Sequence, residues 1–257
     1  MPITAHAVKT RTITLKTYDG AEASAFVAEP DGPGPYPAVV FGAEAMGPNR
    51  FGQRVAADVA ALGYVTITPD YYRGAGPSEP DNYDDFTEVM AAIGELDFGA
   101  ATFDVLSGVD WARAQANVDP DRVALWGYCT GATLTMLAAS LDRRIAATVL
   151  FFPSQPTFEA LTSKRPTHAI DLIWAIACPV LMLSGDQDAI LSPAVLAEMR
   201  RRFDQWGVSY ESHLYPGAGH AFSADAPHMH NAEATAASWA AATEFLDRHL
   251  RPARGGD

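Results

Sequence analysis

The sequence has 257 residues, of which 48% are apolar and 19% charged, so it can build a sizeable core and is not globally disordered. The 18 lysines and arginines stand against 31 aspartates and glutamates, which gives a formal net charge of −13. This balance disfavours a nucleic-acid partner, because binding to a phosphate backbone needs a basic face. We expect a single domain over residues 1–257 that acts on a small molecule.

The N-terminal segment and the two cysteines bear on the cellular compartment. Residues 1–15 lack the uninterrupted apolar stretch of a secretory signal, and no run reaches the ~18 apolar residues that a membrane helix needs. Cys129 and Cys178 are too few for a disulfide framework. We therefore expect a cytoplasmic protein that does not bind membranes and exists as a monomer or small homo-oligomer.

Residues 8–28 predict a β-hairpin. Polar and apolar residues alternate over 8–18, Asp19-Gly20 is a turn signal, and residues 23–28 can return as the second arm. The proline- and glycine-rich cluster at 30–35 follows, and it is too short to be a domain linker. The hairpin should therefore belong to the same sheet as the later strands.

After this cluster, short apolar runs alternate with longer amphipathic segments, which is typical of a parallel sheet covered by helices. The predicted strands are residues 37–41, 64–69, 123–128, 146–152, 179–184 and 209–215. The predicted helices are 49–62, a segment ending near Asn117, 132–141, 193–206 and 231–250. This pattern predicts an α/β fold: a mostly parallel central sheet with an N-terminal antiparallel hairpin and helices on both faces.

The polar, proline-rich segment 74–85 follows the end of a predicted strand. Ligands of open parallel sheets bind outside the carboxyl ends of the strands, so this segment is a candidate wall of a site. The alternative is an ordinary connecting loop.

The strongest local motif is Gly127-Tyr128-Cys129-Thr130-Gly131, between an apolar strand and a helix-forming run. This strand-turn-helix context is that of a nucleophile elbow, whose sharp turn requires neighbours without bulk. A thiol there lies at the positive end of a helix, where a thiolate is favoured and a nearby imidazole can take its proton. The alternative is a buried structural cysteine beside glycines that only turn the chain.

An acid and a histidine follow Cys129 in the order expected of a hydrolase triad. Asp186 and Asp188 come after the strand 179–184, and we favour Asp188 because the longer spacing lets the chain clear the strand end. Asp186 is expected to cap the local turn instead. His220 lies on a glycine-flanked loop after the last strand, where its ring can reach the nucleophile and its tautomer can be fixed by a carboxylate.

No motif indicates a cofactor or a metal. Neither a glycine-rich dinucleotide fingerprint nor a phosphate-binding loop is present. His228 and His230 form a His-x-His pair, but no cysteine pair or His-Glu-x-x-His motif accompanies it. We expect neither cofactor nor metal.

These motifs resemble those of the dienelactone hydrolase (carboxymethylenebutenolidase) family of α/β-hydrolases, over about residues 12–250. The resemblance rests on the cysteine elbow, on residues 185–188 and 217–222, and on segments 41–47 and 68–74. It implies that Glu44 helps to generate the thiolate, a role open to a buried carboxyl with a raised pKa. It also implies an oxyanion hole formed by the backbone N–H groups of Thr130 and Ala45.

The sequence departs from the family at the residues that bind the substrate carboxylate. The dienelactone-cleaving members have an arginine four residues after the histidine, where this chain has Ala224, and residues 77–97 contain no cation. Arg73 could hold a carboxylate in a bidentate manner or pair with a nearby acid. Tyr72, Phe222 and Trp174 are candidate walls of the substrate site, or plain core residues.

We therefore expect a hydrolase of a small ester or lactone with a Cys129-His220-Asp188 triad. One alternative is another acyl substrate, such as a thioester or an amide. The other is a catalytically silent scaffold that binds a small molecule.

Overall fold

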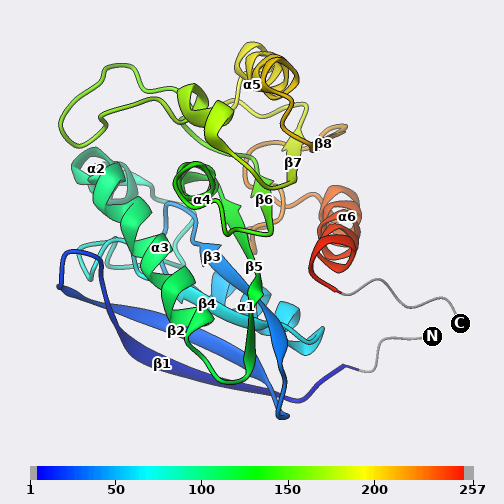
Figure 1. Ribbon diagram of the computed structural model, residues 1–257. Helices are drawn as coiled ribbons and strands as arrows, with labels where there is room; N and C mark the ends of the chain where they lie inside the picture. The colour runs from blue at the N-terminus through cyan, green and yellow to red at the C-terminus, as the bar shows by residue number, and fades with distance from the viewer. Residues whose placement is uncertain (1–4, 252–257) are drawn as a thin grey trace, which may run out of the picture.

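Eight strands form one sheet in the computed structural model, which describes residues 5–251 (Figure 1). Their order across the sheet is β1-β2-β4-β3-β5-β6-β7-β8. The bounds are β1 Val8–Lys16, β2 Glu22–Pro30, β3 Tyr36–Gly42, β4 Val65–Pro69, β5 Val118–Tyr128, β6 Ala147–Phe151, β7 Val180–Gly185 and β8 Tyr210–Tyr215. β2 pairs antiparallel with β1 and β4, and the pairs from β4 to β8 are parallel. The predicted sheet and its antiparallel hairpin are confirmed.

Helices cover both faces of the sheet (Figure 1). Their bounds are α1 Arg50–Ala61, α2 Thr87–Glu95, α3 Phe98–Arg113, α4 Thr130–Leu141, α5 Pro193–Trp206 and α6 Ala232–Leu250, with a short 3₁₀ helix, η1, at Ala169–Ala175. Buried side chains of α3, α4 and α5 belong to one apolar cluster, and those of α1 and α6 belong to a second. Burial of both faces explains why the central strands are apolar throughout.

Side-chain caps fix where several helices begin and end. Asn49, Ser192 and Asn231 accept hydrogen bonds from backbone N–H groups in the first turns of α1, α5 and α6, respectively. Gly207 ends α5 in the left-handed conformation, with φ of 66°, which a glycine adopts without steric cost. These caps lie within one residue of the predicted boundaries.

Several parts of the fold differ from the sequence prediction, among them β5, α2 and η1, a segment for which no helix was predicted. β5 begins at Val118 rather than Val123, because Val118 pairs with Tyr36 before an irregularity in the register. α2 lies in the acidic segment for which no helix was predicted, and only Val89 and Ile93 of this helix are buried. Among the described residues, no helix is long and apolar enough to cross a membrane.

Candidate active site

Cys129 occupies a strained turn between β5 and α4. Its φ of 50° and ψ of −118° are sparsely populated by residues other than glycine. Gly131 passes so close to β3 that a Cβ at this position would lie 2.1 Å from the carbonyl oxygen of Gly42. Gly127 is equally confined, since its Cβ would lie 2.4 Å from the carbonyl oxygen of Gly131. This geometry is that of a nucleophile elbow, with Cys129 at the N-terminus of α4.

The imidazole of His220 contacts the carboxylate of Asp188 and not that of Asp186. Nδ1 of His220 lies 2.9 Å and 3.0 Å from the two carboxylate oxygens of Asp188. The Asp188 carboxylate also accepts hydrogen bonds from the N–H groups of Ile190 and Leu191, both at 2.8 Å, so its orientation is fixed. Asp186 instead accepts a hydrogen bond from the N–H of Gly217 at 2.7 Å.

His220 and Cys129 are both partly buried, and each affects the pKa of the other. Burial works against both charged forms, but the neighbouring imidazolium outweighs it and lowers the pKa of the Cys129 thiol. The thiolate and the Asp188 hydrogen bond likewise outweigh burial and raise the pKa of His220. Nε2 of His220 is buried and has no hydrogen-bond partner among residues 5–251. The directions of these two pKa shifts are those expected of a thiolate beside an imidazolium.

The two backbone N–H groups that the family resemblance implies as an oxyanion hole are those of Thr130 and Ala45. Within the described part of the chain, no hydrogen bond uses the N–H of Thr130 or of Ala45, and both residues line the same cavity as Cys129. A backbone hydrogen bond stabilises the elbow, since the N–H of Ser154 donates to the carbonyl oxygen of Cys129 at 3.1 Å. Such preorganised donors can stabilise a developing negative charge without rearrangement.

Glu44 lies in the wall of this cavity and is buried. Asn49 Nδ2 donates to its carboxylate at 2.8 Å, and the hydroxyl of Tyr83 donates to the same oxygen. Burial outweighs these hydrogen bonds and raises the pKa of Glu44. No hydrogen bond between Glu44 and Cys129 is present among the described residues. Asn49 and Tyr83 were not predicted as site residues, although Tyr83 lies in the segment 74–85, which was predicted as a wall of the site.

The Cys129 cavity, as we call this space, has a volume of about 390 Å³. α2, where no helix was predicted, contributes Val89, Met90 and Ile93 to it. The lining residues are Glu44, Ala45, Met46, Tyr83, Phe86, Val89, Met90, Ile93, Cys129, Thr130, Ser154, Gln155, Ile190, His220, Ala221 and Met229. No lysine or arginine is among these lining residues, so the His220 imidazolium is the one positive charge that they can offer, and it is already paired with Asp188.

Arg73, Tyr72, Phe222 and Trp174, which were expected to contact substrate, are not among the residues that line this cavity. Arg73 donates to Asp104 in a bidentate manner, at 2.7 and 2.8 Å, and also to Asp19, so its guanidinium is already occupied. Tyr72 is buried and its hydroxyl donates to the carbonyl of Ala45.

The two other expected wall residues miss the cavity for opposite reasons. Phe222 is fully buried against Phe152, which makes it a core residue. Trp174 is 60% exposed on η1. The aromatic rings of tyrosine and phenylalanine that line the cavity are instead those of Tyr83 and Phe86.

Within residues 5–251, no group of three or more histidine, cysteine, aspartate or glutamate side chains could hold a metal ion. His228 instead lies 3.8 Å from a carboxylate oxygen of Asp84. Cys129 and Cys178 are both free thiols.

The eight-stranded sheet, its helical layers and the elbow after β5 define an α/β-hydrolase fold. The chain belongs to the dienelactone hydrolase family, whose pattern matches residues 23–250. It is therefore a hydrolase of the class that acts on esters and lactones.

Several known proteins are similar to this chain over nearly their whole length. A protein of Bradyrhizobium named "Probable 2-oxo-3-(5-oxofuran-2-ylidene)propanoate lactonase" is 29% identical over 245 residues, which is 94% of this chain and 97% of that protein. A "Putative carboxymethylenebutenolidase" of Synechocystis is 27% identical, over 95% of this chain and 98% of the relative. The crystal structure of a "Putative Dienelactone Hydrolase" from Klebsiella pneumoniae has a TM-score of 0.85 at 24% identity, over 94% of this chain and 99% of the other.

Proposed function

We propose that this protein hydrolyses small, uncharged esters or lactones through a covalent intermediate on Cys129. The observation that carries the proposal is the pairing of His220 with Asp188 beside a thiol held at a nucleophile elbow. The thiolate is favoured by the adjacent imidazolium and by the N-terminus of α4.

The reaction divides into acylation and deacylation. The Cys129 thiolate attacks the carbonyl carbon, and the N–H groups of Thr130 and Ala45 stabilise the resulting oxyanion. When the tetrahedral adduct collapses, the carbon–oxygen bond to the leaving alkoxide breaks and the imidazolium of His220 gives that alkoxide its proton. The acyl group remains on sulfur as a thioester, and the alcohol of an opened lactone stays attached to it.

Deacylation returns the enzyme to its starting state. Neutral His220 takes a proton from water, and the hydroxide attacks the thioester carbonyl within the same oxyanion hole. The carbon–sulfur bond breaks, which releases the carboxylic acid and restores the thiolate and the imidazolium. Asp188 keeps Nδ1 protonated throughout and stabilises the charged ring.

The cavity indicates the charge of the substrate. The Bradyrhizobium relative is named for a lactone that carries a carboxylate. In this chain Ala224 stands four residues after His220, Arg73 is held by Asp104 and Asp19, and no lysine or arginine is among the residues that line the Cys129 cavity. Burial of a substrate carboxylate without a partner is costly, so we assign an uncharged substrate to this enzyme.

Glu44 is assigned a secondary role in proton transfer. Its carboxyl faces the same cavity and has a raised pKa, so it can accept a proton from the thiol when His220 is displaced. Because His220 already favours the thiolate, removal of Glu44 should cost less activity than removal of His220.

The proposal is tested by comparing Cys129→Ala, His220→Ala and Glu44→Gln with the wild-type enzyme on p-nitrophenyl acetate, an uncharged lactone and an acyl thioester. We expect the cysteine and histidine variants to lose hydrolysis of the first two substrates, and Glu44→Gln to retain a measurable fraction. Retention of wild-type hydrolysis by Cys129→Ala would overturn the proposal. If kcat/KM is more than tenfold higher for the thioester than for the ester and the lactone, the proposed substrate class changes from esters and lactones to thioesters.

A further inference from the structure

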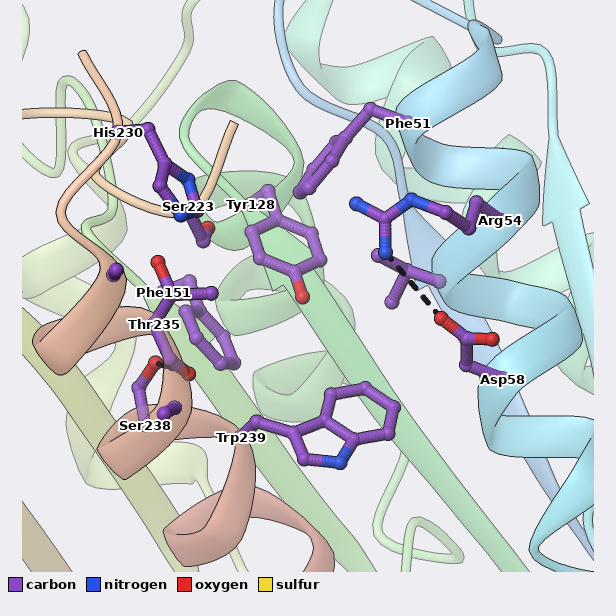
Figure 2. Close-up of a pocket in the computed structure, with 13 residues that line it drawn as sticks. Phe51, Arg54, Asp58, Tyr128, Phe151, Ser223, His230, Thr235, Ser238 and Trp239 are labelled. Carbon is purple, nitrogen blue, oxygen red and sulfur yellow. Dashed lines mark hydrogen bonds and ion pairs between the residues drawn. The ribbon is translucent and has the colours of Figure 1, made fainter. Parts of the chain in front are cut away.

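A second cavity, of about 340 Å³, lies between α1 and α6, and we call it the α1–α6 cavity (Figure 2). The segment 220–230 borders both cavities. His220, Ala221 and Met229 of this segment line the Cys129 cavity, whereas Ser223 and His230 line the α1–α6 cavity. The second cavity is therefore separate from the reacting thiol.

Aromatic rings form much of the wall of the α1–α6 cavity. Phe51 and Tyr128 meet edge to face, with ring centroids 5.2 Å apart. Phe151 and Trp239 face the same space from β6 and α6 (Figure 2). Edge-to-face and offset contacts with such rings favour a planar aromatic guest.

Four hydroxyl residues line this cavity. Thr235 and Ser238 already donate to backbone carbonyl groups, which leaves the hydroxyls of Ser223 and Tyr128 for a guest. Ser223 is only 6% exposed, and its buried Oγ has no hydrogen-bond partner among residues 5–251. The hydroxyl of Tyr128 points into the space between Arg54 and Trp239 (Figure 2). Burial raises the pKa of Tyr128, so this hydroxyl stays protonated and can donate. A guest hydroxyl would supply the partner that the buried serine lacks.

The charges at the rim disfavour an anionic guest. Arg54 Nη2 lies 2.6 Å from a carboxylate oxygen of Asp225, and Nη1 lies 3.3 Å from one of Asp58. Two carboxylates therefore face one guanidinium, which leaves no net positive charge for an anion to pair with. The same guanidinium lies 5.6 Å from the centre of the Phe51 ring, so it closes the aromatic wall on that side.

We propose that the α1–α6 cavity is a binding site for an uncharged, single-ring aromatic alcohol, separate from the site of hydrolysis. The ring packs among Phe51, Tyr128 and Trp239, and the guest hydroxyl bonds to the Oγ of Ser223. The volume lies at the lower end of the range for small-molecule sites, which suits one ring.

The test is titration calorimetry with phenol as the probe, on wild-type protein and three variants checked for folding by circular dichroism. Ala236→Trp fills the α1–α6 cavity from an exposed position of α6, and Ser223→Ala removes the polar contact. Met90→Trp narrows the Cys129 cavity instead and is the matched control. Benzoate, which carries a carboxylate where phenol carries a hydroxyl, is titrated into the wild type as the charged analogue.

We expect phenol to bind the wild type with one site and a Kd of about 1 mM or tighter. Ala236→Trp should abolish binding, Ser223→Ala should weaken it about three- to tenfold, and Met90→Trp should leave it unchanged. Benzoate should bind at least about tenfold more weakly than phenol. The proposal is overturned if phenol does not bind, if Met90→Trp abolishes binding while Ala236→Trp does not, or if benzoate binds as tightly as phenol. None of these results depends on whether Cys129 is the nucleophile.

Discussion

The carboxylate of Asp188 lies 2.9 Å and 3.0 Å from Nδ1 of His220, although 32 residues separate the two along the chain. The carboxylate is almost completely buried, and the N–H groups of Ile190 and Leu191 hold one of its oxygens. This contact fixes the ring so that Nε2 is turned away from Asp188. The orientation of His220 is thus determined by the loop after β7.

Asp188→Asn should lower kcat by roughly 10²- to 10⁴-fold, because an amide can stabilise the wrong tautomer of His220 and cannot stabilise the imidazolium. Asp186→Asn is the matched control, since Asp186 bonds to the N–H of Gly217 and not to the ring. It should change kcat less than about threefold. Steady-state hydrolysis of p-nitrophenyl acetate measures both, and equal losses would contradict the assignment of Asp188.

The pH dependence should show a thiol that ionises below its ordinary range. The pKa of Cys129 is lowered and that of His220 is raised. Activity should therefore rise as pH increases through the lowered thiol pKa, and fall at high pH when the imidazolium loses its proton. The rate of alkylation of Cys129 by iodoacetamide as a function of pH reports the thiol directly. In the His220→Gln variant, the pKa of the Cys129 thiol should return toward its ordinary range. An unchanged pH profile of alkylation in this variant would refute the ion pair between Cys129 and His220.

Gly131→Ala should destabilise the fold by more than about 3 kcal/mol, because its Cβ would lie 2.1 Å from the carbonyl oxygen of Gly42 and β3 would have to move. Gly94→Ala is the control, since the added methyl on α2 meets no atom within 4 Å. Alanine there should stabilise the protein by about 0.5–1 kcal/mol through helix propensity. Urea unfolding measures both, and a Gly131→Ala protein of wild-type stability would contradict the close approach.

Met90→Arg should shift specificity toward carboxylated lactones. Met90 lines the Cys129 cavity and is 60% exposed, so an arginine can place its charge at the rim without burying it. We expect kcat/KM for a carboxylated lactone to rise about three- to tenfold relative to its methyl ester. Met90→Gln, which adds polarity without charge, should leave this ratio within about twofold. A wild-type enzyme that already prefers the free carboxylate would contradict the uncharged substrate.

The sequence predicted the sheet and the cysteine elbow well because both depend on local patterns. The strands are apolar runs bounded by turn residues, and the elbow requires glycines at fixed spacing around Cys129. The choice of Asp188 over Asp186 agrees with the observed hydrogen bonds, because the spacing after a strand end limits where a side chain can reach.

The walls of the Cys129 cavity could not be predicted in the same way. The partners of Glu44 come from elsewhere in the chain, with Tyr83 39 residues away, so their contact is visible only after folding. Phe222 and Trp174 were expected to contact substrate, yet one packs into the core and the other faces solvent. The sequence is compatible with two roles for Arg73, because the acids that hold it, Asp104 and Asp19, lie on other elements.

The central claim, that Cys129 carries the acyl group, is tested most directly by mass spectrometry of the acid-quenched enzyme during turnover of p-nitrophenyl acetate. We predict a mass increase of one acetyl group on the peptide that contains Cys129, which hydroxylamine removes and which is absent from Cys129→Ala. An acetyl group on any other residue, or turnover by Cys129→Ala at the wild-type rate, would contradict the account.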